Sequence, residues 1–203
     1  PGLSPLLASV GPQHSPHHRV SPRVVGEGGG SSARPRLRVL SINLNILPGG
    51  SSLVYGGEHS YKNERLEEFL SHLDEYDVVA VQECFSSPFF PPSLCRQRRV
   101  LEAAREQGFH YSVRARQPTV YDLVRRRKWT DSGLLILSRY TITSSDALEF
   151  RHDGYHYDRW ASKGALYAKL RIGETQVMLF NCHLQASHLS LPRSAASASR
   201  SGG

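Results

Sequence analysis

The chain has 203 residues, 39% of them hydrophobic, which is enough for one domain with a buried core. Its three cysteines argue against a disulfide framework, and the absence of any run of eighteen apolar residues argues against a membrane-spanning helix. The formal net charge is +7, but the two ends of the chain carry more of this excess than residues 36–187, so the charge suits an anionic membrane surface as well as a nucleic acid.

The first 35 residues predict no folded element. They are rich in Pro, Gly, Ser and His and lack a hydrophobic period, a composition typical of disorder. Residues 37–45 are the first predicted strand, and the Pro-Gly-Gly-Ser-Ser sequence that begins at Pro48 ends it as a loop. Asn43 and Asn45 lie on the same face at the carboxyl end of this strand.

A helix and a second strand follow the first strand. Residues 77–84 are almost all apolar, the pattern of a strand that is covered on both faces, and they end in Gln82 and Glu83. Before them, residues 62–73 place apolar side chains at helical spacing on one face. That face consists of Leu66, Phe69, Leu70 and Leu73. This order of elements predicts a parallel β-α-β crossover.

The next stretch contains an aromatic loop, a second helix and a short strand. Phe89 and Phe90, in the loop of residues 86–92, suit contact with lipid or substrate and suit equally a place at the edge of the core. Residues 94–107 predict a helix and residues 109–114 a strand.

Residues 118–129 are the least regular part of the domain, and no helix or strand is expected there. The sequence Arg125-Arg-Arg-Lys-Trp puts four positive charges beside an aromatic ring. Such a group could meet lipid headgroups, the phosphates of a nucleic acid or only solvent, and the residues alone leave these three interpretations open.

Two hairpins are predicted in the last third of the chain. The first joins residues 133–138 to residues 141–150 through a short turn. The second joins residues 163–171 to residues 175–185 and turns at residues 172–174.

Three of the predicted strands end in polar side chains. Side chains alternate along a strand, so His183 lies on the face opposite to Cys182, and both Cys84 and Cys182 are expected to be buried apolar residues. Open sheets bind ligands at the carboxyl ends of their strands, which is where Asn43, Glu83 and His183 would meet. An amide, a carboxylate and an imidazole in one place suit a divalent metal ion and a phosphate together.

Five short motifs occur along the chain in a characteristic order. They are Ser41-Ile-Asn-Leu-Asn, Val81-Gln-Glu, Asp131-Ser-Gly-Leu-Leu-Ile-Leu-Ser-Arg-Tyr-Thr-Ile, Ser162-Lys-Gly-Ala-Leu and Asn181-Cys-His-Leu-Gln-Ala. Residues 37–187 thereby resemble the endonuclease/exonuclease/phosphatase superfamily, whose best-known fold is that of DNase I. The third and fourth motifs are most similar to those of neutral sphingomyelinases.

The resemblance implies a fold and a domain organisation. The fold is α/β, a DNase I-like four-layer sandwich of two mixed β-sheets flanked by helices, which is expected to be incomplete here. The expected domains are a disordered tail at residues 1–35, a truncated catalytic domain at residues 36–187 and a low-complexity tail at residues 188–203.

The resemblance also implies roles for the strand-end residues. Glu83, in the Gln-Glu motif, is the expected ligand of Mg²⁺. Asn43 is expected beside the metal, where it would orient metal-bound water or a phosphate oxygen, with Asn45 as the alternative. His183 is implied to donate a hydrogen bond to the scissile phosphate.

Lys163 is a further expected catalytic residue. It precedes Gly164, so its side chain can reach a phosphate with little steric hindrance. Asp158, in the same loop, either holds Lys163 away from the site until a lipid surface arrives or forms a plain ion pair with it.

The later motifs of the superfamily have no counterpart in the chain. They include an Asp-x-Asn motif and a closing Asp-His pair whose His is the general base, but no Asp follows His183. We therefore expect a fragment or a wrong gene model, with a degraded relative as the alternative. We also expect the chain alone to be inactive and poorly stable, because residues 77–84 and 177–184 have apolar faces that need a second sheet to cover them.

The expected function is Mg²⁺-dependent hydrolysis of sphingomyelin to ceramide and phosphocholine. The expected state is a monomer in the cytoplasm or in peripheral contact with a membrane, and organelle targeting is left open. The alternatives are another hydrolase of the superfamily, namely a nuclease or an inositol-phosphate phosphatase, and a non-catalytic module that binds a membrane or a partner. The Ser162-Lys-Gly-Ala-Leu motif favours sphingomyelin over nucleic acid.

Overall fold

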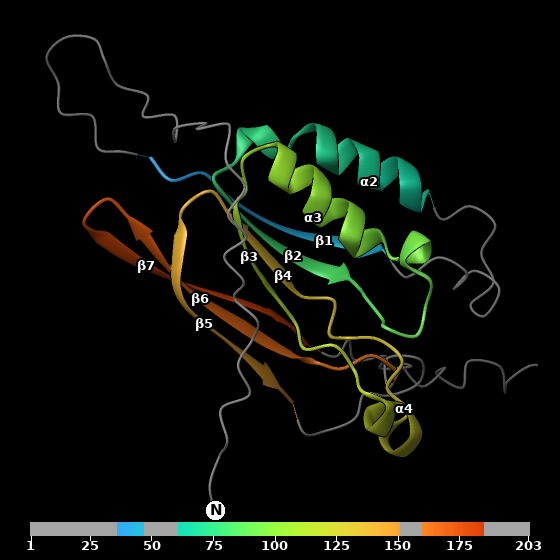
Figure 1. Cartoon of the computed structure of the whole chain (residues 1–203). Coiled ribbons are helices and arrows are strands. Elements are labelled where there is room, and N and C mark those ends of the chain that lie inside the picture. The colour runs from blue at the N-terminus through green and yellow to red at the C-terminus, as the bar shows by residue number, and fades with distance from the viewer. Residues whose placement is uncertain (1–35, 47–60, 151–159, 185–203) are drawn as a thin grey trace, which may run out of the picture.

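Two β-sheets packed face to face form the centre of the protein, and two helices cover the first sheet (Figure 1). The computed structural model describes residues 36–46, 61–150 and 160–184. In chain order the helices and strands are β1 (Val39–Ile46), α2 (Lys62–Ser71), β2 (Val78–Cys84), α3 (Arg96–Glu106), β3 (Tyr111–Arg114), α4 (Val120–Arg126), β4 (Leu135–Ser138), β5 (Thr141–Glu149), β6 (Gly164–Ile172) and β7 (Thr175–His183). The expected tails, residues 1–35 and 188–203, lie outside the described residues.

The first sheet has the strand order β1-β2-β4-β3 and contains the predicted β-α-β unit. β1 and β2 are parallel, with Val39 opposite Val78, so the predicted crossover through α2 is confirmed. Val79 and Val81 of β2 face the helices, whereas Val78 faces the second sheet, and all three are fully buried. The expectation that residues 77–84 would leave an apolar face uncovered is therefore wrong.

The helices α2 and α3 lie side by side on the outer face of the first sheet (Figure 1). Leu66, Phe69 and Leu70 of α2 and Val100 and Ala104 of α3 belong to one core cluster with β2 and β4. The predicted helix of residues 94–107 and the predicted strand of residues 109–114 are confirmed, with shorter bounds.

Within the described residues the second sheet has the strand order β5-β6-β7, and these three strands are antiparallel. Its last two strands form the predicted hairpin, in which Ile172 lies opposite Thr175 and Gly164 lies opposite His183. Leu166, Ala168 and Leu170 alternate along β6 toward the first sheet, and each is at most 1% exposed.

The first predicted hairpin is wrong, because β4 and β5 belong to different sheets. β4 pairs with β2 and β3, whereas β5 pairs with β6. Arg139 lies in the turn between β4 and β5. Its backbone N–H donates to the carbonyl of Asp77, and its side-chain Nε donates to the carbonyl of Tyr76. These bonds hold the turn against the first sheet, and the chain crosses to the second sheet immediately after it.

The helix α4 lies in the region where no regular element was expected. A capping box starts it: the Thr119 hydroxyl accepts from the backbone N–H of Asp122, and the Asp122 carboxylate accepts from the backbone N–H of Thr119. The apolar side chains of α4 do not follow a core-facing pattern, so hydrophobic periodicity could not predict the helix.

The outer face of β7 is apolar and exposed within the described residues. Phe180, Met178 and Leu184 are 64–68% exposed, and Cys182, on the same face of β7, is exposed as well. Cys84 is buried as predicted, but the prediction for Cys182 is wrong, because only the opposite face of β7 packs on the first sheet. Among the described helices, none is both long and apolar enough to cross a membrane.

Gly164→Ala should destabilise the protein, because the added Cβ would overlap the backbone carbonyl of Leu148 on β5. Such an overlap between paired strands should lower the free energy of unfolding by about 3 kcal/mol. Gly173→Ala is the matched control: its Cβ would meet nothing within 4 Å, so only its left-handed φ of 58° opposes the change, at a cost of about 1 kcal/mol. Urea unfolding followed by circular dichroism measures both, and equal losses would contradict the close approach of β5 and β6.

Candidate active site

The side chains of Asn43, Glu83 and His183 meet at one edge of the two sheets. Nδ2 of Asn43 donates to Oε1 of Glu83 over 2.8 Å, and Nε2 of His183 lies 3.4 Å from the same oxygen. The Glu83 and His183 side chains are 22% and 24% exposed, so the group is accessible to solvent and still partly enclosed. The structure thus brings together the three strand-end residues that the sequence singled out.

The backbone at this edge adopts conformations that side chains rarely tolerate. Glu83 has a φ of 55° and Asn45 a φ of 49°, both in the left-handed region. The pairing of β1 with β2 shifts register between Asn43 and Ile46, which marks a bulge at the strand end. Oδ1 of Asn43 accepts from the backbone N–H of Asn45 over 2.9 Å, so Asn43, and not Asn45, turns its amide toward Glu83.

Asn181 links the second sheet to the first. It lies on β7 two residues before His183 and is 2% exposed. Its Nδ2 donates to the carbonyls of Val81 on β2 and Leu135 on β4, over 2.8 and 3.1 Å. Its Oδ1 accepts from Nε2 of Gln82 over 2.6 Å. These three bonds fix the end of β7, and with it His183, against the strand that carries Glu83.

Asp131 holds the loop that follows Glu83. It is fully buried, and its Oδ1 accepts from the backbone N–H groups of Ser86 and Gly133 over 2.9 and 3.0 Å. Its Oδ2 accepts from the side-chain amides of Gln117 and Gln97 over 3.0 and 3.3 Å. Burial raises the pKa of Asp131 to about 7, although the hydrogen bonds from Ser86, Gly133 and Gln97 oppose the shift.

Gly133 packs closely against the backbone of Glu83. A Cβ at this position would lie 3.1 Å from the Cα of Glu83 and 2.8 Å from the ring of Phe85, and the φ of 68° also disfavours a side chain. The carbonyl of Gly133 accepts from the backbone N–H of Cys84 over 2.9 Å. The Asp-Ser-Gly sequence therefore supports the Glu83 turn through one carboxylate and one close backbone approach.

Lys163 is buried at the start of the second sheet, 6% exposed. It precedes Gly164, the residue paired with His183, so the register places it beside the end of β7. Together with Ser162, Arg116 and Glu149 it lines a small cavity of about 50 Å³. Its expected partner, Asp158, lies outside the described residues.

A family model described as "Endonuclease/Exonuclease/phosphatase family" matches residues 40–199. The chain belongs to this family. A sphingomyelinase of Dictyostelium discoideum is 34% identical over 126 residues, which cover 58% of this chain and 26% of that protein. The chain therefore spans about a quarter of the length of this curated relative.

Solved structures of other proteins share the fold of this chain. Sphingomyelinase C from Streptomyces griseocarneus aligns with a TM-score of 0.53 and 22% identity, over 75% of this chain and 50% of that one. A beta toxin mutant of Staphylococcus aureus with bound magnesium ions aligns with a TM-score of 0.55 and 22% identity, over 74% of this chain and 50% of that one. The expected DNase I-like α/β fold is thereby confirmed, and the described strands and helices form part of it.

The family motifs suggested Asn43, Glu83, His183 and Lys163, but not the residues that position them. Asn181 and Asp131 were recognised only as the first residues of two motifs. A buried amide or carboxylate reveals its role through its partners, and here these come from distant parts of the chain.

Within the described residues, no group of three or more His, Cys, Asp or Glu side chains could hold a metal ion.

Asn181→Leu should loosen the junction between the sheets. The replacement leaves the carbonyls of Val81 and Leu135 and the amide of Gln82 without their bonds to Asn181, so the free energy of unfolding should fall by about 2–3 kcal/mol. Gln176→Leu, an exposed position on the same strand, is the matched control and should change it by less than about 0.5 kcal/mol. Guanidinium unfolding curves measure both, and equal stabilities would contradict the link.

Asp131→Asn should remove a pH dependence of stability. The pKa of Asp131 is about 7 in the folded protein, above its ordinary value of 3.8, so the folded state binds a proton that the unfolded state has released. Asp131 therefore contributes to the free energy of unfolding in full below about pH 4, and this contribution is lost as the pH rises to about 7. The stability of the wild type relative to Asp131→Asn should fall by up to about 4 kcal/mol over this range and stay level above it.

Urea unfolding between pH 4 and 8.5 measures this difference. Glu106→Gln, at an exposed position on α3, is the control for a carboxylate-to-amide change and should show no such trend. A difference that rises with pH would contradict the raised pKa of Asp131.

Proposed function

We propose that the protein containing this chain is a Mg²⁺-dependent phosphodiesterase that hydrolyses sphingomyelin to ceramide and phosphocholine. The observation that carries the proposal is the meeting of Asn43 and His183 at one carboxylate oxygen of Glu83. The identity with the Dictyostelium sphingomyelinase supports sphingomyelin as the substrate. The magnesium ions of the beta toxin structure support the choice of metal.

The side chains at the site suit a single Mg²⁺ ion. Oε1 of Glu83 contacts Asn43 and His183, whereas Oε2 accepts no hydrogen bond from the described residues. Mg²⁺ commonly takes one or two carboxylates and completes its octahedron with water and phosphate oxygens. Glu83 would hold the ion with Asn43 beside it, and the bound ion would offset the charge of the phosphodiester and of the leaving oxygen.

Asn43 has the task of orienting Glu83. Its Oδ1 is engaged by the backbone N–H of Asn45, so the amide cannot rotate freely, and Nδ2 is directed at the carboxylate. A carboxylate held in one orientation before substrate arrives needs no reorganisation during the reaction.

His183 has the task of binding the scissile phosphate through an N–H group. Asn181 fixes the strand end that carries it, so its ring stays beside Glu83. A preorganised donor of this kind is worth about 10²–10³-fold in rate. Lys163, buried next to the same strand end, is proposed as an additional positive charge for the phosphate.

Glu83→Gln should abolish the Mg²⁺ dependence of the reaction together with the activity, because it removes the charge that holds the metal. His183→Ala should lower kcat by about 10²–10³-fold and leave the affinity for Mg²⁺ nearly unchanged, because it removes a contact to the phosphate and not to the metal. The rate of hydrolysis of sphingomyelin vesicles at varied Mg²⁺ concentration gives kcat and the apparent affinity for Mg²⁺ of each variant. The assay is run on the product of the complete gene and, in parallel, on residues 1–203.

Two exposed positions provide matched controls. Glu106→Gln and His110→Ala make the same chemical changes outside the site and should leave the rate within about twofold of the wild type. Mg²⁺-dependent cleavage of DNA or of an inositol phosphate in preference to sphingomyelin would replace the proposed substrate. A complete gene product that cleaves none of them would leave the binding module as the better description.

A further inference from the structure

The helix α4 presents its apolar side chains to solvent. Val120, Tyr121 and Val124 are each 68% exposed, and Trp129, just after the helix, is 45% exposed. Val124 lies four residues after Val120 and three residues after Tyr121, so the three side chains share one helix face. Asp122, which carries a charge, is the buried residue of the helix. This is the reverse of the arrangement in a helix that packs on a core.

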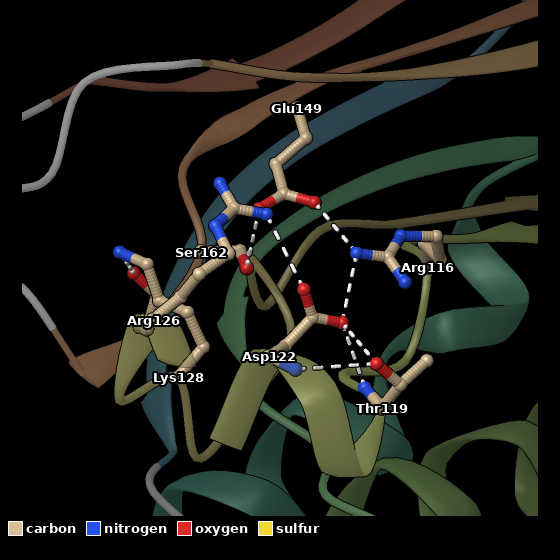
Figure 2. A network of polar contacts seen from close by, with 8 residues as sticks. Arg116, Thr119, Asp122, Arg126, Lys128, Glu149 and Ser162 are labelled. Carbon is tan, nitrogen blue, oxygen red and sulfur yellow. Dashed lines mark hydrogen bonds and ion pairs between the residues drawn. The ribbon is translucent and has the colours of Figure 1, made fainter. Parts of the chain in front are cut away.

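A polar network holds the helix in this orientation (Figure 2). The Asp122 carboxylate accepts from the backbone and hydroxyl of Thr119, both over 2.8 Å, and from the guanidinium groups of Arg116 and Arg126, over 3.0 and 3.3 Å. Both arginines also reach Glu149, at the end of β5. Burial opposes the charge on Asp122, but the hydrogen bonds from Thr119 and Arg116 outweigh it and lower its pKa to about 2. The network is therefore ionised at neutral pH, and it anchors α4 to the second sheet.

The exposed charges of this region are positive. Arg125 and Arg127 are exposed beside the apolar face. Between residues 115 and 132 the acidic residues are Asp122 and Asp131, which are only 4% and 0% exposed. An apolar face with tyrosine, tryptophan and two arginines around it matches the boundary between acyl chains and anionic headgroups.

The same region is joined to the edge of the candidate site. Thr130 forms a bridge with Ala161, and Nζ of Lys128 donates to the carbonyl of Ala161 over 3.1 Å. Three residues later Gly164 pairs with His183. Figure 1 shows α4 beyond the end of β5, at the end of the sheets where β2 also finishes.

We propose that Val120, Tyr121, Val124 and Trp129, with Arg125 and Arg127, form a docking surface for a lipid bilayer that contains anionic lipids. The valines and aromatic rings enter the headgroup region, and the two arginines contact phosphate and carboxylate groups of the lipids. A nucleic acid would match the arginines but would gain nothing from two exposed valines. The proposal goes beyond catalysis, because it concerns where the protein binds and needs no turnover to be tested.

The experiment measures binding of the 203-residue chain to vesicles of phosphatidylcholine with and without phosphatidylserine. The chain should cosediment with the vesicles that contain phosphatidylserine, and binding should weaken as salt is added, because surface charges are screened. Val124→Asp should weaken binding by about tenfold or more, and so should the pair Arg125→Glu with Arg127→Glu.

Phe180→Ser is the matched control. Phe180 is as exposed as Val124 but lies on the outer face of β7, so this change should leave binding within about twofold of the wild type. Circular dichroism of each variant checks that the fold is retained.

Tryptophan fluorescence tests the surface without altering α4. The chain has two tryptophans, Trp129 and Trp160. Anionic vesicles should shift the emission of Trp160→Phe to the blue, and brominated lipids should quench it, whereas Trp129→Phe should show neither effect. The proposal is overturned if the vesicles do not bind, if Phe180→Ser weakens binding as much as Val124→Asp, or if duplex DNA and not the vesicles changes the Trp129 emission.

Discussion

The hydrogen bonds of Asn181 are the interaction on which the geometry of the candidate site depends. The core between the two sheets is mostly apolar, and apolar contacts are non-directional, so they permit small slides of one sheet over the other. The Asn181 amide is directional and reaches two backbone carbonyls of the first sheet and the side chain of Gln82. It therefore sets the register of β7 against β2. Because side chains alternate along a strand, a slip of one residue would turn His183 away from Glu83.

Asp131 fixes the loop after β2 through directional hydrogen bonds, as Asn181 fixes the end of β7. Glu83 has a left-handed backbone conformation, which costs about 1–2 kcal/mol for a residue with a side chain. The four hydrogen bonds to Asp131 and the close approach of Gly133 hold the segment that follows in place, and this offsets the strain. The segments that carry the carboxylate and the imidazole are thus held by two different buried side chains, Asp131 and Asn181. The site is organised before any ligand is present, as a charge-stabilising site requires.

The sequence predicted the elements whose hydrophobic pattern is periodic and whose partners are close along the chain. The unit from β1 to β2 and the hairpin of β6 and β7 are of this kind, and so is the shared edge of Asn43, Glu83 and His183. The separation of β4 from β5 was not predictable in this way, because a short turn usually joins paired strands. Here the bonds of Arg139 to Tyr76 and Asp77, just before β2 and 63 and 62 residues earlier in the chain, override that tendency. The role of Asn181 was out of reach for the same reason, since its carbonyl partners lie 46 and 100 residues away in the chain.

The orientation of α4 shows how a buried charge overrides hydrophobic patterning. Turning the helix over would bury Val120 and Val124, a gain of about 1.5–3 kcal/mol each. It would also remove the buried Asp122 carboxylate from Thr119 and from the two partly exposed arginines, and each hydrogen bond to a charged group contributes about 1.5–3 kcal/mol. The arginines would lose one of their two carboxylates in the same step, and the capping box of Thr119, worth about 1 kcal/mol, would be lost as well. The polar and apolar contributions are therefore of similar size, and the network is strong enough to hold the helix with its apolar face in water. The apolar face that this leaves in water is unfavourable there, and a bilayer surface is an environment in which that unfavourable exposure is relieved.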